Sequence, residues 1–270
     1  MSGAFVAVSD DATTSWWNPA GLATGAYFSG TVERRTAQNV TGEGTLGVSV
    51  SIPSLGVSYY RLRIGARAPS GSTGSLGGDR EDQGTTSTRL PTHVLSQFGV
   101  TVGQSLGEYL VLASTLKLVQ VDQTRGDLDV GVMATLGAVR LAAVVKNLGD
   151  ADLTAGGLPV SPGRQVRVGG AYLPQSRGAV SLVAAVDADL TKTPTAWGDE
   201  RHVAGGVELW LKRRLGVRGG IGLNTVGDAR PSFSGGASAA IRGGLYVDAQ
   251  VTRGDDEATK GWGLALRAMF

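Results

Sequence analysis

Apolar and polar residues alternate along most of the chain with a period of two. The alternation is clearest at the end of the chain, where one side of the pattern carries Trp262, Leu264, Leu266 and Phe270. This period predicts β-strands with one apolar side, because successive side chains of a strand point to opposite faces. The longest nearly apolar run, 130–139, is shorter than the roughly 18 residues that a membrane-spanning helix requires. The pattern therefore predicts an all-β chain.

Reading the alternation through the whole sequence predicts about 14 strands, an even number of the kind that bacterial single-chain membrane barrels use. Many of these segments reach the roughly 9 to 11 residues with which a tilted strand crosses a bilayer. The expected ranges are 27–37, 43–53, 55–65, 92–106, 107–121, 126–138, 139–148, 163–174, 177–190, 200–212, 214–223, 231–242, 244–254 and 261–270.

The connections between these strands alternate between tight and long. Tight joints are expected at 53–54, 106–107, 137–138, 174–176, 212–213 and 243–244. Longer joints, rich in Gly, Asp, Thr and Pro, are expected at 66–91, 149–162, 191–199, 224–230 and 255–260. Short periplasmic turns and longer outward loops are typical of outer-membrane barrels. We therefore expect a transmembrane antiparallel β-barrel in the bacterial outer membrane, with both chain ends on the periplasmic side and lipid around it.

A soluble barrel or sandwich would show the same period with its apolar side turned inward. Two features favour the membrane barrel. Aromatic residues fall towards the expected strand ends, as they do in interfacial girdles. The polar side carries long charged residues, as a wet lumen would. The charges expected to line the lumen include Arg61, Arg63, Lys117, Arg140, Arg167, Glu208, Arg218 and Arg267.

Cations outnumber anions on this expected luminal side, which leaves two interpretations open. The charges can form cross-strand ion pairs that hold a narrow lumen together, which is the interpretation we favour. Alternatively they can line a path that weakly favours anionic solutes.

Composition narrows the chemistry that the chain can perform. It has 42 Gly, no Cys, two His and a formal charge of +2. The many glycines suit strands that curve closely, and the scattered charge does not point to nucleic acid. Without cysteine and with only His93 and His202, no metal site and no cofactor are expected. We expect no enzyme either; a Ser–His pair that includes His202, like that of outer-membrane phospholipases, is a distant third possibility.

Residues 1–26 precede the first expected strand and differ from the rest. Asp10 and Asp11 can bond to polar lumen walls, and the run Trp16, Trp17, Asn18, Pro19, Ala20 and Gly21 follows. This opening resembles that of the FadL-type outer-membrane transport superfamily, which includes long-chain fatty-acid porins and shorter PorV/PorQ-like barrels. The resemblance implies an N-terminal plug or hatch over 1–26, inside a barrel formed by 27–270.

Two further features resemble outer-membrane proteins. Phe270 closes an alternating strand, which together with Trp262, Leu264 and Leu266 resembles the signal read by the outer-membrane insertion machinery. The strand end 144–149 looks like one seen in the PorV-like branch, which the modest length of the chain also favours.

The resemblance implies passive transport of small hydrophobic or amphipathic molecules through a plugged barrel. The alternative is a structural or adaptor barrel that docks a secretion or surface-protein partner, as PorV-like proteins do. A continuous apolar groove beside the plug would favour transport, whereas a lumen crowded with paired charges would favour the adaptor.

Overall fold

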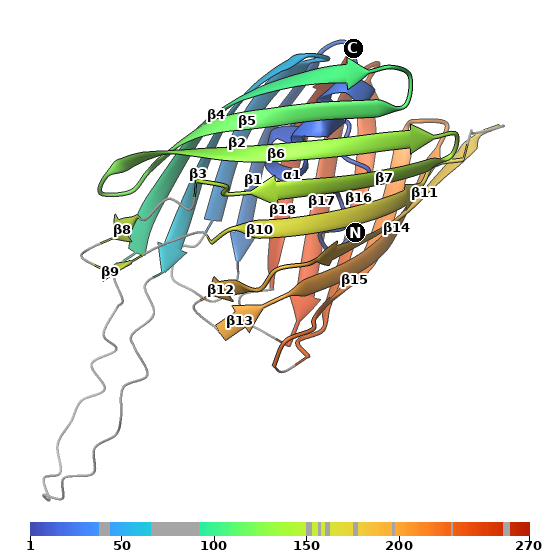
Figure 1. Cartoon of the computed structure of the whole chain (residues 1–270). Helices are drawn as coiled ribbons and strands as arrows, with labels where there is room; N and C mark the ends of the chain where they lie inside the picture. The colour runs from blue at the N-terminus through green and yellow to red at the C-terminus, as the bar shows by residue number, and fades with distance from the viewer. Residues whose placement is uncertain are drawn as a thin grey trace, which may run out of the picture.

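The computed structural model describes residues 1–37, 44–65, 92–149, 153–155, 158–159, 163–174, 178–195, 198–227, 229–255 and 260–270. These residues form one closed barrel of 14 antiparallel strands, in which β1 pairs with both β2 and β18 (Figure 1). The expected fold class is therefore confirmed. In the described residues no helix has the length and the apolar character needed to cross a membrane.

The strands of the barrel lie within a few residues of their expected positions. They are β1 Ser29–Ala37, β2 Gly44–Ile52, β3 Leu55–Gly65, β4 Thr92–Leu106, β5 Leu110–Gln120, β6 Thr124–Leu136, β7 Val139–Lys146, β10 Gln165–Tyr172, β11 Val180–Asp189, β14 His202–Leu211, β15 Leu215–Asn224, β16 Ser232–Arg242, β17 Leu245–Gly254 and β18 Gly261–Met269. The tight joints gather at one rim together with the C-terminus, and the longer loops leave from the other rim (Figure 1).

Two small hairpins in the long loops were not predicted. They are β8 Thr154–Ala155 with β9 Leu158–Pro159, and β12 Thr193–Thr195 with β13 Gly198–Glu200. Ladders of two or three residues are too short to show an alternation in sequence, and both contain a proline, which is unfavourable inside a sheet.

The outer wall of the barrel is apolar. Leu116 is 62% exposed and Val186 is 63% exposed, although both belong to well-paired strands. Exposed apolar side chains recur on every second residue, which places them towards lipid. Aromatic residues on this face include Phe28, Tyr109, Tyr172 and Phe270 towards the rim of tight turns, and Phe233 and Trp262 towards the rim of long loops, while Tyr59 and Phe98 lie near the middle of β3 and β4.

Arg61 and Arg63 correct one expectation. Both are exposed on the outer face of β3, and Arg61 pairs with the outward Leu46. The lumen side of this strand is occupied instead by Tyr60, which is 1% exposed, and by Leu62. Bulky apolar residues lie on both sides of β3 and hide its alternation, so charge alone is a poor guide to facing there. The two arginines are not luminal.

The N-terminal segment lies inside the barrel, where α1 Thr14–Trp17 and the 3-10 helix η1 Pro19–Thr24 are drawn behind the front strands (Figure 1). Its small residues Ala4, Ala7 and Ala20 are fully buried and share one apolar cluster with Met133 and Val144 of the wall. The helix η1 contacts β4, β5 and β6. The barrel therefore packs around residues that precede its first strand.

Candidate functional site

The carboxylate of Asp187 on β11 holds the beginning of the N-terminal segment. One of its oxygens accepts hydrogen bonds from the backbone N–H groups of Phe5 at 2.7 Å and Val6 at 2.8 Å. Nearer the N-terminus, the hydroxyl of Ser2 lies 2.9 Å from the hydroxyl of Ser234 on β16. The segment thus meets the wall through specific polar contacts, because buried backbone donors need partners.

The Asn18–Gly21 turn is built into the wall beside β6. Asn18 caps η1 by accepting a hydrogen bond from the N–H of Ala20 at 3.1 Å, and its amide donates to the carbonyl oxygens of Val6 and Val132. Pro19 occupies the first position of η1, where its fixed φ suits a helix and no N–H is needed. A Cβ at position 131 would lie 2.0 Å from the Asn18 side-chain oxygen, so this close approach requires Gly131.

The two tryptophans of the segment have different partners. Trp16 packs on Tyr60 with ring centroids 4.9 Å apart, and its backbone carbonyl accepts a hydrogen bond from Lys146 at 2.8 Å. Trp17 stacks on Phe5 with centroids 4.9 Å apart, and Arg35 lies 5.7 Å from the centre of its ring. Each tryptophan therefore combines an aromatic contact with a cation.

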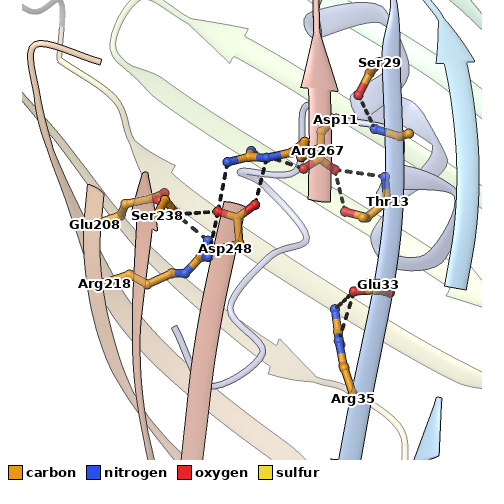
Figure 2. Close-up of polar contacts among 11 residues, drawn as sticks. Asp11, Thr13, Ser29, Glu33, Arg35, Glu208, Arg218, Ser238, Asp248 and Arg267 are labelled. Carbon is orange, nitrogen blue, oxygen red and sulfur yellow. Dashed lines mark hydrogen bonds and ion pairs between the residues drawn. The ribbon is translucent and has the colours of Figure 1, made fainter. Parts of the chain in front are cut away.

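A ladder of alternating charges crosses the lumen wall to the N-terminal segment (Figure 2). Arg218 lies 3.7 Å from Glu208 and 3.1 Å from Asp248. Arg267 bridges Asp248 at 3.2 Å and Asp11 at 3.3 Å. These groups come from four strands and one turn of the segment. Glu208 pairs directly with Arg218 in the register, whereas Asp248 and then Arg267 are each displaced by two residues along their strands.

Two other groups of charges line the lumen. Lys117 lies 2.6 Å from Asp129 and 3.2 Å from Asp127, and Arg167 lies 2.5 Å from Asp189. Arg140, by contrast, has a buried nitrogen without a hydrogen-bond partner among the described residues. Apart from Arg61 and Arg63, the charges named from the sequence therefore lie inside, and most of them form ion pairs.

A cavity of about 440 Å³ lies between the N-terminal segment and the wall, where it is lined by residues of β1, β11, β14, β15, β17 and β18. Its lining runs from Met269 and Arg213, beside the rim of tight turns, to Arg35 near the other end of β1. On its inner side it touches Asp10 and Trp17. The cavity therefore follows most of the length of this wall.

The lining of the cavity mixes charge with aromatic surface. It contains five acidic and four basic residues, so the cation excess expected from the sequence does not hold here. Phe5, Trp17, Trp210 and Tyr246 supply apolar faces. The Arg213 side chain makes no hydrogen bond or ion pair with another described residue and is exposed. Such a surface suits a solute that has both an apolar part and a polar end.

We examined the described residues for a metal site and for a Ser–His pair. No three of their His, Asp and Glu side chains lie close enough to hold a metal ion. His202 donates its backbone N–H to Asp189 at 3.1 Å, and its ring makes no hydrogen bond to a serine of the described strands. The side chain of His93 lies outside the described residues.

The assembly-signal residues Trp262, Leu264, Leu266 and Phe270 all face outward, with Phe270 65% exposed. The backbone of Phe270 exchanges two hydrogen bonds with Phe28, which joins the last strand to the start of the first. Recognition by the insertion machinery stays a prediction.

Sequence reasoning missed several residues that hold the segment. Asp187 lies on the polar side of its strand, but nothing in the sequence connects it with the segment, and neither Ser234 nor Tyr60 was singled out. The signal for Tyr60 is a large side chain that follows the small inward residue Ser58 on the same strand. The partners of Asp187 and Ser234 lie more than 180 residues away, so no local pattern could identify them.

Solved structures with similar folds are outer-membrane channels. The chain is similar to the CymD monoaromatic hydrocarbon channel, with a TM-score of 0.63 and 10% identity over 98% of this chain and 94% of that one. A Pseudomonas aeruginosa FadL homologue matches with a TM-score of 0.62 and 10% identity over 99% and 96%. The Ralstonia pickettii toluene transporter TbuX matches with a TM-score of 0.60 and 12% identity over 98% and 95%.

No family model and no curated protein sequence matches the chain. At such low identity the structural likeness establishes the fold alone. The protein is a bacterial outer-membrane β-barrel with the architecture of FadL-type channels.

Proposed function

We propose that the protein passes small amphipathic molecules across the outer membrane, through the cavity between the N-terminal segment and the β14–β18 side of the wall. In this proposal residues 1–26 fill the opposite side of the lumen, and the barrel of residues 27–270 forms the rest of the conduit. The observation that carries the proposal is the length of the cavity, whose lining extends from Met269 to Arg35.

The chemistry of the lining supports an amphipathic solute. An apolar molecule can lie on Trp17, Trp210 and Tyr246, because aromatic faces supply large apolar contact area. Most of the charges beside them are engaged in ion pairs, such as Arg218 with Asp248. Paired charges attract a single ion weakly but can hydrogen bond to a polar end group. This combination favours solutes with a small neutral or zwitterionic head.

The test is to fill the cavity from the wall. Ala265 lines the cavity from β18, whereas the neighbouring Leu266 is 46% exposed on the lipid face. We expect Ala265→Trp to lower solute flux into proteoliposomes about tenfold, because an indole occupies a large part of a passage of this size. Flux is measured with an aromatic amine or phenol as the probe.

The matched control is Leu266→Trp, which places the same indole one residue away in the lipid. Its flux should equal that of the parent protein. Both variants are first checked for heat-modifiable migration, which reports a closed barrel. Equal flux in the two variants, both folded, would exclude the cavity as the conduit.

The second candidate is an adaptor barrel that docks a protein partner at the cell surface. It is favoured by the ion-paired lumen, since Lys117, Arg167, Arg218 and Arg267 are each bound to a carboxylate of the wall or the segment. A parent protein that folds but passes neither the amine nor the phenol above the rate of empty liposomes would favour this candidate over transport.

A further inference from the structure

Three arginines form a row on the outer face of the barrel near the rim of long loops. Arg34 of β1 pairs with Leu46 of β2, which in turn pairs with Arg61 of β3. Arg63 follows two residues later on the same face of β3. All three side chains are exposed. With neighbouring strands about 4.8 Å apart, Arg34 and Arg61 lie roughly 10 Å from each other across Leu46.

The row carries positive charge that no described residue compensates. None of the three side chains makes a hydrogen bond or ion pair with another described residue. On the described outer face of β1–β4 and β18, no carboxylate is present: Glu33, the acidic residue of these strands, points inward and binds Arg35 at 2.7 Å. Among the described residues, this arginine cluster on the lipid-facing wall therefore has no carboxylate partner.

The depth of the row follows from its place along the strands and from Trp262. Arg34 is the sixth of the nine residues of β1, and Arg61 and Arg63 are the seventh and ninth of the eleven residues of β3, so the row lies in the half of these strands that leads to the long loops. Trp262 pairs with Thr36, one outward position beyond Arg34. Aromatic girdles mark the boundary between hydrocarbon and headgroups, and long arginine side chains next to them reach the headgroup layer.

We propose that Arg34, Arg61 and Arg63 form a binding site for the phosphate groups of an anionic lipid in the outer leaflet. Guanidinium groups bind phosphate oxygens through paired, charge-assisted hydrogen bonds. Leu46, between the arginines, offers an apolar surface to the acyl chains. The site lies on the outside of the wall and is independent of any passage through the lumen.

The experiment compares two double variants of the full chain that each lose two positive charges. Arg61→Gln with Arg63→Gln removes the proposed site. Lys212→Gln with Arg214→Gln removes two exposed cations from the turn at the opposite rim. Binding of lipid A, which carries phosphate groups, is titrated in neutral detergent by native mass spectrometry. We expect the first variant to bind about tenfold or more weakly, because each surface arginine contributes substantially to anionic-lipid binding.

The second variant should bind lipid A within about twofold of the parent, and added salt should weaken parental binding because exposed charges are screened. Phosphatidylcholine, which has no net charge, and inorganic phosphate test whether the site takes an anionic lipid rather than any lipid or any phosphate. Neither probe should saturate the protein. If Arg61→Gln with Arg63→Gln does not close into a barrel, Arg34→Gln alone is used. Equal lipid A binding by parent and variant would overturn the proposal.

Discussion

Asp10 lies where the N-terminal segment meets the cavity, and it makes no hydrogen bond or ion pair with another described residue. Burial raises the pKa of its carboxyl to about 6, and the negative charge of Asp11 adds to this shift. Arg140 and Arg267 oppose it, whereas Glu208 adds to it. The segment therefore holds a carboxyl group that prefers to be neutral.

This preference predicts how stability depends on pH. Because the folded chain binds the Asp10 proton more tightly than the unfolded chain does, this contribution is complete below about pH 4 and is lost as pH rises through about 6. Asp10→Asn should therefore raise the free energy of unfolding at about pH 7.5 and flatten its change between about pH 5 and about pH 7.5. Urea unfolding in detergent at the two pH values measures both effects.

Asp11→Asn is the control for this prediction. It removes the carboxylate that forms an ion pair with Arg267 at 3.3 Å and accepts a hydrogen bond from the hydroxyl of Thr13 at 2.5 Å. It should lower the free energy of unfolding at about pH 7.5, in contrast to Asp10→Asn. If both variants raised the free energy of unfolding, repulsion between the negative charges of the segment, and not the burial of Asp10, would explain the effect.

The sequence predicts whether a side chain faces lipid or the lumen where apolar and polar residues alternate cleanly along the strand, and not elsewhere. Lys117 and Arg267 lie inside as expected, because their strands place Leu116, Leu118 and Leu266 towards lipid. Arg61 faces outward in the half of β3 that leads to the long loops, where, in our proposal, an outward charge reaches lipid headgroups. Sequence alone does not tell at which depth a strand leaves the hydrocarbon.

At the scale of elements, neighbouring positions of one strand should respond oppositely to charge. Leu266 faces lipid, while Ala265 lies between the inward carboxylates Glu33 and Asp248 on the adjacent strands. Leu266→Arg should cost about 2 to 4 kcal/mol of unfolding free energy if it lies near the midplane, whereas Ala265→Arg gains carboxylate partners and should cost less than about 1 kcal/mol.

Unfolding of both arginine variants is followed by tryptophan fluorescence in lipid vesicles with increasing urea. A larger loss for Ala265→Arg than for Leu266→Arg would mean that the apolar face does not meet lipid. Position 265 suits this test better than Ala113, which is also inward but is 6% exposed and packs in the apolar cluster against the N-terminal segment.

Strands of the barrel could be predicted from sequence because lipid and lumen impose opposite demands on alternate residues over many positions. Short elements in other surroundings could not. The helices α1 and η1 span four and six residues and lie against the wall on several sides, so they show no amphipathic period. Asn18 and Pro19 do carry a local signal, as a cap followed by a first-turn proline, but the preceding tryptophans obscure it.

At the scale of the whole molecule, the question is whether the segment moves relative to the barrel. Its contacts are distributed around the lumen: Ser234 on β16, Asp187 on β11, Lys146 on β7 and Arg267 on β18 all hold it. Breaking one of them leaves the others in place. The sequence could not reveal this arrangement, because closing the barrel brings together residues that are far apart in the chain.

A single disulfide can test the movement. The hydroxyl oxygens of Ser2 and Ser234 lie 2.9 Å apart, and cysteine is nearly isosteric with serine, so Ser2→Cys with Ser234→Cys places two sulfurs close to the roughly 2.0 Å of a disulfide bond. The natural chain has no cysteine, so no other pairing competes. Oxidation then ties residue 2 to β16, while the other end of the segment continues into β1.

We expect solute flux through the oxidised variant to equal that through the reduced one, because the proposed cavity exists while the segment is docked. The single variant Ser234→Cys, treated with the same oxidant, controls for chemical damage. If oxidation lowers flux and a reductant restores it, the segment must leave the wall for solutes to pass, and it acts as a hatch. Equal flux in both states, combined with the block by Ala265→Trp, would identify residues 1–26 as a fixed lining of the conduit.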